Sequence, residues 1–142
     1  YRLSYTIKVN INDYYKAFKI CNNVRSKGDI TPFIITFMEI IRKSFENLES
    51  ALSRRLNSFM DYLKKISTIK EFAREDINTL CSYLIQAQLF SEQGITKREL
   101  CSLMRISTAT LDHKIDVIRK AGFLCEKKIG RTLYFNFNVE ML

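Results

Sequence analysis

The residues Gly94–Gly122, GITKRELCSLMRISTATLDHKIDVIRKAG, carry the strongest indications of the fold. Thr96 followed three residues later by Glu99 is typical of a capping box, in which two side chains satisfy free backbone N–H groups at the start of a helix. Ser107 is a second residue of N-cap type, and Arg105–Ser107, between the two helices, predicts a tight turn. Two capped helices joined by such a turn indicate a helix-turn-helix.

The segments on either side complete a winged helix. A helix begins upstream near Asp76 and is ended by Gly94, and Ile95 follows as a very short strand. Downstream, Phe123–Asn138 (FLCEKKIGRTLYFNFN) alternates around Gly130, which predicts a two-stranded hairpin. Helix, short strand, helix, turn, helix and hairpin is the order of a winged helix-turn-helix, and we expect it to occupy residues 76–142.

Each of the three helices has one apolar face at the spacing that an amphipathic helix requires. We expect these faces to form the core of this module. The core residues predicted in this way are Ile77, Leu80, Cys81, Leu84, Leu100, Leu103, Met104, Leu111, Ile115 and Ile118.

Residues 1–66 are predicted to be helical. Ser4 is expected to cap a short helical turn, and a second helix starts near Asn12 or Asp13 and continues until Gly28 ends it. Its apolar face carries Tyr14, Ala17, Phe18 and Cys21.

A long helix is predicted from Thr31 as N-cap and Pro32 as first helical residue, because proline lacks only an N–H that is unpaired at this position. Neither glycine nor proline interrupts the sequence up to Ile66, so one helix or two abutting helices fit. The apolar residues recur close to a heptad, which fits either a partner helix and a homodimer or packing against the chain's own neighbours. The polar segment Ser67–Glu75 (STIKEFARE) is expected to be the linker between the two modules.

The predicted function of the winged helix is binding of duplex DNA. In this fold the third helix faces the major groove and the hairpin contacts the backbone or the minor groove. Thr108, Thr110 and His113 lie in the N-terminal half of that helix, the part that enters the groove, and are expected near the bases. The outer face of the helix, opposite its apolar residues, carries Ala109, Thr110, His113, Asp116 and Lys120. The expected phosphate contacts are Lys97, Arg98, Lys127, Lys128 and Arg131.

The distribution of charge leaves a second function open. The chain carries a formal net charge of +8, but Asp112 and Asp116 lie on or beside the presumed reading face and would repel phosphates. Winged helices also serve as docking or dimerisation modules. A protein–protein interaction module without DNA is therefore the alternative.

Other functions find little support in the residue types. The single histidine, His113, has no evident catalytic partner, the four glycines are dispersed, and the four cysteines form no C-x-x-C pair. We therefore expect no catalytic residue, no metal site, no cofactor and no evident small-molecule ligand. Asp13 and Asp29 are assigned to helix capping. The even number of cysteines leaves disulfides as an alternative, but the preferred interpretation is buried, reduced thiols of a cytoplasmic protein. The absence of a long apolar run predicts no membrane span.

The N-terminal half resembles the region that follows the active site of Fic-family proteins, in which a Tyr-Tyr helix leads through a G-D-x-T-P/W connector into a long helix. The residues that carry the resemblance are Ser4, Tyr14, Tyr15, Gly28, Asp29, Thr31 and Pro32. Several members of that family have a C-terminal winged helix, as Asp76–Asn138 would be here.

The resemblance implies a regulatory C-terminal region rather than an active site. Fic proteins typically transfer AMP from ATP to a protein hydroxyl through a loop of the form H-P-F-x-[DE]-G-N-G-R, and this chain lacks that loop. Because the first residue is Tyr1 rather than Met, we expect a longer parent, which the resemblance implies to be such an adenylyltransferase. No catalytic or nucleotide-binding residue of the family is present in this chain.

Overall fold

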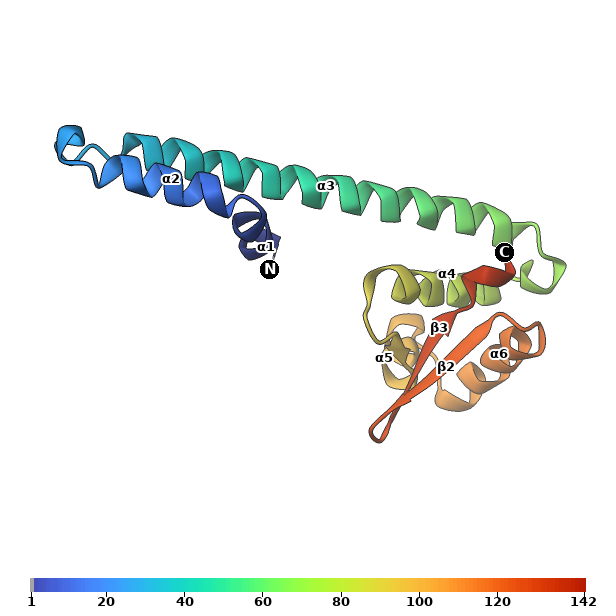
Figure 1. Ribbon diagram of the computed structural model, residues 1–142. Helices are drawn as coiled ribbons and strands as arrows, with labels where there is room; N and C mark the ends of the chain where they lie inside the picture. Colours follow the sequence, from blue (N-terminus) through green and yellow to red (C-terminus); the bar gives the residue numbers. More distant parts are fainter. Residues whose placement is uncertain (1) are drawn as a thin grey trace. The chain divides into compact units, whose positions relative to one another are not determined.

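The computed structural model describes residues 2–142, and it is mainly helical with a small antiparallel sheet near the C-terminus (Figure 1). The chain forms two compact units, which divide between Arg54 and Arg55. Within the described residues, no helix combines the length and the apolar character that crossing a membrane requires.

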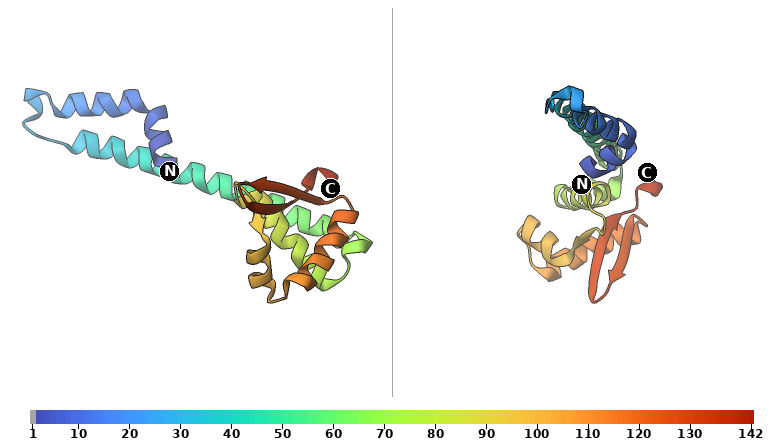
Figure 2. Two further views of the ribbon diagram at one scale, coloured as in Figure 1. Left: turned by 90° about the horizontal axis from the view of Figure 1, so that it is seen from below. Right: turned by 60° about the vertical axis from the view of Figure 1, so that its left-hand side comes forward.

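The first unit contains α1 (Arg2–Val9), α2 (Ile11–Cys21), a 3₁₀ turn (Val24–Ser26) and the N-terminal part of α3 (Thr31–Ser67). In Figures 1 and 2, α2 runs alongside the first turns of α3. The buried side chains of this unit are few: Thr6, Ala17, Ile40 and Ser44. The rings of Tyr14, Phe18, Phe33 and Phe37 join the two helices, with neighbouring centroids 5.4–6.5 Å apart.

Two helix boundaries in this unit differ from the sequence prediction. Ser4 lies inside α1 rather than capping it, and α2 ends at Cys21 rather than at Gly28. Asn22 and Asn23 follow α2, and the Asn23 side chain caps the 3₁₀ turn that occupies the space before Gly28. Asparagine competes well for local backbone hydrogen bonds, which explains the earlier end of the helix.

The start of α3 is one residue earlier than predicted. Ile34 N–H donates to the carbonyl of Ile30, so Thr31 is already helical and is not the N-cap. The oxygen that satisfies the Thr31 N–H belongs to Asp29, at 2.9 Å. The pKa of the Asp29 carboxyl is lowered mainly by a hydrogen bond with the Thr31 side chain and further by this backbone N–H. The assignment of Asp29 to capping is therefore confirmed, and α3 is a single continuous helix.

The second unit is a winged helix built on the end of α3. It contains α4 (Glu75–Phe90), β1 (Ile95–Thr96), α5 (Lys97–Met104), α6 (Thr108–Lys120), β2 (Leu124–Ile129) and β3 (Thr132–Phe137). A 3₁₀ turn, Val139–Met141, follows. The strands have the order β1-β3-β2, all neighbours antiparallel, and β2 and β3 form the wing. The predicted order of elements is confirmed.

The core of this unit contains nearly all of the predicted apolar residues. The buried members from the three helices include Leu80, Leu84, Leu100, Leu111 and Ile118, and the sheet adds Phe135 and Phe137. Leu103 is an exception, because it is 50% exposed. With only eight residues, α5 buries Leu100 and leaves the side of Leu103 open to solvent.

The segment Ser67–Glu75, expected to be a linker, is packed into the second unit. It contains a 3₁₀ turn, Lys70–Phe72, and the Phe72 side chain is fully buried. The Phe72 ring lies 5.3 Å from that of Phe123 and 6.2 Å from that of Phe137, measured between centroids. The buried Ile66 at the end of α3 belongs to the same core.

Candidate nucleic-acid interface

Most of the outer face of α6 is solvent-exposed, and Asp116 on this face is half-buried. Thr108, Thr110 and His113 are all exposed, as predicted. The Thr110 hydroxyl lies 2.9 Å from that of Ser107, whose oxygen also accepts from the Thr110 N–H and caps the helix. Thr110 is therefore held by the cap, whereas Thr108 and His113 make no side-chain hydrogen bond among the described residues.

The first acidic side chain of α6 is paired with a lysine of α5. Lys97 Nζ lies 2.6 Å from Asp112 Oδ1, so the start of α5 is joined to the first turns of α6. This pair has two consequences for the predicted interface. The negative charge of Asp112 is compensated, and Lys97 is not available as a free phosphate contact.

The second acidic side chain of α6 is paired within a cluster that reaches the wing. Arg119 donates to Asp116 and, at 2.6 Å, to Glu126 of β2. The hydrogen bond to Glu126, together with the nearby carboxylates, raises the pKa of the Arg119 guanidinium. Arg119 thus compensates Asp116 and Glu126 and fastens the wing to α6.

A third ion pair holds the opposite side of α6. Lys114, whose side chain is 12% exposed, donates to Asp76 in the first turn of α4, and Arg74 lies 2.9 Å from the same carboxylate. The hydrogen bond from Lys114 is the main cause that lowers the pKa of Asp76. These contacts fix the orientation of α6 in the unit, so that its outer face is presented in a defined way.

The hairpin register separates the two adjacent lysines of the wing. Lys128 is paired with Leu133, and Lys127 with Tyr134. Because side chains alternate along a strand, Lys128 shares a face with Glu126, which contacts α6, and Lys127 lies on the other face. Arg131 is exposed in the two-residue turn that Gly130 begins.

Sequence reasoning left Lys120 and Arg119 out of the interface. Lys120 follows His113 by seven residues, which places it two turns further along the same face of α6. The sequence prediction placed Lys120 on this face but assigned it no phosphate contact. The role of Arg119 depends on Glu126 in another element, and no local pattern signals such a contact.

Several cations around α6 and the wing have no acidic partner. Within residues 2–142 the structure shows no ion pair for Arg98, Lys120, Lys127, Lys128 or Arg131. All of them are solvent-exposed. This set contains four of the five residues predicted to contact phosphate, the fifth being Lys97.

The cysteines differ in exposure more than predicted. Only Cys81 is buried, and burial raises the pKa of its thiol to about 12. Cys21 and Cys101 are half-buried, Cys125 is exposed, and all four thiols are free, so the expectation of four buried cysteines is wrong. In the described part of the chain, no three side chains of His, Cys, Asp or Glu gather in a way that could hold a metal ion.

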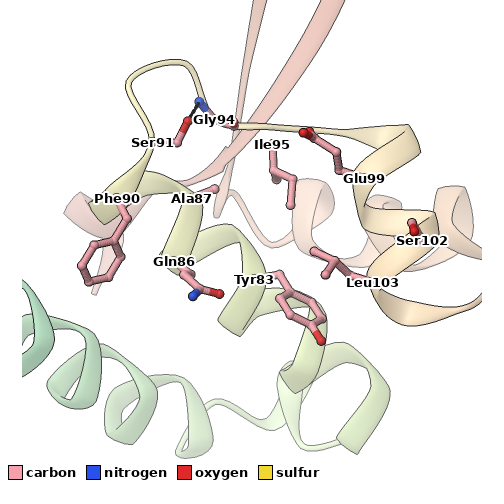
Figure 3. A pocket seen from close by; sticks show the side chains of 10 residues that line it. All are labelled: Tyr83, Gln86, Ala87, Phe90, Ser91, Gly94, Ile95, Glu99, Ser102 and Leu103. Atoms are coloured by element: carbon pink, nitrogen blue, oxygen red, sulfur yellow. Dashed lines mark hydrogen bonds between the residues drawn. The ribbon is translucent and has the colours of Figure 1, made fainter.

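A cleft of about 520 Å³ lies away from these residues, between α4 and α5 (Figure 3). Tyr83, Phe90 and Leu103 give it an apolar lining, and the lining also includes Ser91, whose hydroxyl accepts a hydrogen bond from the Gly94 N–H. None of the predicted interface residues lines it. The cleft is therefore separate from the candidate interface.

In comparisons with known proteins, no family model, curated protein or solved structure matches this chain.

Proposed function

We propose that the winged helix binds duplex DNA, with the outer face of α6 in the major groove and the wing against the phosphate backbone. The observation that carries the proposal is the pairing of both acidic side chains of α6. Uncompensated carboxylates on this helix would repel phosphates, and Asp112 and Asp116 are each held by a cation. The net charge that remains free around α6 and the wing is therefore positive.

The free side chains divide into two groups by position. Thr108 and His113, in the N-terminal half of α6, are the candidates for contact with base edges. The candidates for phosphate contact are Arg98 at the start of α5, Lys120 at the end of α6, and Lys128 and Arg131 on the wing. Lys97 is assigned a positioning role, because its ammonium group is held by Asp112.

A fluorescence anisotropy titration with a labelled mixed-sequence duplex tests this proposal. We expect the chain to bind at low salt with a Kd on the order of 10⁻⁶–10⁻⁴ M, the range of sequence-independent binding. Lys120→Glu should weaken binding by about tenfold. Lys64→Glu is the matched control, because Lys64 is an exposed lysine of α3 outside the interface. Absence of binding at low salt, or equal losses in the two variants, would exclude the proposal.

We also propose that the chain is the regulatory region of a Fic-like protein. The support for this proposal is the resemblance of the Gly28–Pro32 connector to that family. In the structure, Gly28 has a φ of +82° and Asp29 caps α3, so these residues also have a purely structural role. Reading the full open reading frame for the H-P-F-x-[DE]-G-N-G-R loop tests this. A frame without the loop would leave a DNA-binding protein with no adenylyltransferase.

Self-association is a second candidate function, and the surface of α3 favours it. The segment Ile34–Leu52 exposes a line of large apolar side chains in the first unit. Such a line is typical of a surface that another protein covers.

A further inference from the structure

The exposed apolar side chains of α3 form one continuous stripe. They follow one another in alternating steps of four and three residues: Ile34, Met38, Ile41, Phe45, Leu48 and Leu52. Ile41 is half-buried, and the other five are 37–66% exposed. In heptad terms, Met38, Phe45 and Leu52 occupy a positions, and the other three occupy d positions.

The stripe is distinct from the face of α3 that packs within the first unit. Phe37, Ile40 and Ser44 face the interior, with Phe37 stacked on Phe33 and the other two buried. At 100° per residue, the stripe lies about a quarter of a turn away from them. α1 and α2 therefore leave the stripe accessible along about 27 Å of helix.

The size of the stripe is sufficient for a helix pair. With about 200 Å² for a fully exposed large side chain, five half-exposed residues offer about 500 Å² per chain. Two copies would then bury about 1,000 Å², the lower limit for a specific protein–protein interface.

We propose that the stripe pairs with the same stripe of a second copy, with the two α3 helices antiparallel. This inference rests on self-association, the second candidate function. Phe45 of one copy packs against Leu48 of the other around a two-fold axis, and Ile41 against Leu52. In the next layer at each end, Met38 packs against the stem of Arg55, whose charge reaches water at the edge of the pair. Ile34 lies beyond this last layer.

The flanking charges determine this register. Arg42 and Glu49 occupy successive e positions beside the stripe, and both are exposed. In an antiparallel pair, e positions face e positions, so Arg42 of each copy faces Glu49 of the other. Arg42 also pairs with Glu46 of its own chain at 2.5 Å, and a guanidinium has enough donors for both carboxylates.

The alternative arrangements are less favourable for specific reasons. A shift by one heptad places Glu49 opposite Glu49, or Arg42 opposite Arg42, according to its direction. A parallel pair in register places Arg55 opposite Arg55 at a d position and brings Arg42 beside the apolar Phe37. Only the antiparallel register described above satisfies both charges.

Charge reversal in the full chain tests the register. The Kd of dimerisation is measured by sedimentation velocity for wild type, Arg42→Glu, Glu49→Arg, the double variant and a 1:1 mixture of the single variants. Each single variant has two repulsive pairs in a homodimer, so we expect its Kd to rise by about tenfold or more. The mixture and the double variant restore attraction, and their dimers should return to within about threefold of wild type. Arg54→Glu is the matched control, because Arg54 occupies an exposed c position.

Each outcome has a definite meaning. Recovery in the mixture and the double variant supports the antiparallel register. The intrachain Arg42–Glu46 pair does not explain it, because both chains of the double variant and one chain of each mixed dimer still lack that pair. A wild type that is monomeric at high concentration overturns self-association itself. A dimer that resists both single reversals but is disrupted by Phe45→Lys overturns the register and keeps self-association. None of these outcomes depends on DNA.

Discussion

At the scale of single residues, Gly94 was expected to end the preceding helix, but in the structure it allows β1 to approach β3. α4 ends at Phe90, and Gly94 lies four residues later, next to β3. Its φ is +107°, and an added Cβ would lie 2.7 Å from the carbonyl oxygen of Phe135 and 2.8 Å from the Asn136 side chain. The backbone of β1 can therefore approach β3 only because residue 94 has no side chain.

We expect Gly94→Ala to lower the free energy of unfolding by about 3 kcal/mol, from the strained φ and the forced separation of β1 from β3. Gly130→Ala is the matched control, because Gly130 also has a positive φ but has no atom near the added methyl group. It should lose only about 1 kcal/mol, the cost of the left-handed backbone alone. Urea unfolding measures both values, and equal losses would contradict the close-approach explanation.

How well residue-scale features can be predicted depends on their range in the sequence. The Thr96–Glu99 capping box was predicted and is confirmed, because both partners lie within one turn. The Lys97–Asp112 pair was not predicted, because its partners lie on different helices and meet only after folding. Arg119 and Glu126 likewise lie on different elements and meet only in the folded chain. For this reason the sequence prediction gave Lys97 a phosphate contact and gave Arg119 no role.

At the scale of elements, two neighbouring lysines of the wing test which face of the hairpin contacts DNA. Lys127 and Lys128 carry the same charge, but the strand directs Lys128 to the face shared with α6 and Lys127 to the other. Lys128→Glu should weaken DNA binding by about tenfold, and Lys127→Glu by less than threefold, since charges beyond about 8 Å are screened at physiological salt. Anisotropy titrations of both variants measure this difference. A larger loss for Lys127→Glu would place the DNA on the opposite face of the wing.

The start or end of a helix or strand was predictable where a single glycine or capping side chain marked it. The starts of α5 after Thr96 and α6 after Ser107 and the hairpin around Gly130 were predicted on those signals and are confirmed. α4 was also predicted, but it ends at Phe90, four residues before Gly94, where its end was expected. The end of α2 was missed because Asn22, Asn23 and Gly28 all offer a stop, and sequence alone does not rank them. Leu103 was assigned to the core because its spacing fits an apolar face that so short a helix does not fully bury.

At the scale of the whole molecule, the sequence predicted two modules but not where they divide. The compact units separate inside α3, between Arg54 and Arg55, although the helix is continuous. The helical spacing of apolar residues does not show with which of the two units a given turn of α3 packs. The boundary between the units could therefore not be predicted from the sequence. Phe72 shows the same limit, because one buried ring in a charged segment is enough to join that segment to a core.

The salt dependence of binding tests the proposed function most directly, because it counts the phosphates that the chain contacts. Four cations (Arg98, Lys120, Lys128 and Arg131) should give log Kobs against log[salt] a slope of about −4, at roughly −0.9 per phosphate. Replacing Lys128 and Arg131 together by glutamine should reduce this slope by about 2. No measurable binding at about 50 mM salt, or a slope that the double substitution leaves unchanged, would contradict DNA binding through α6 and the wing.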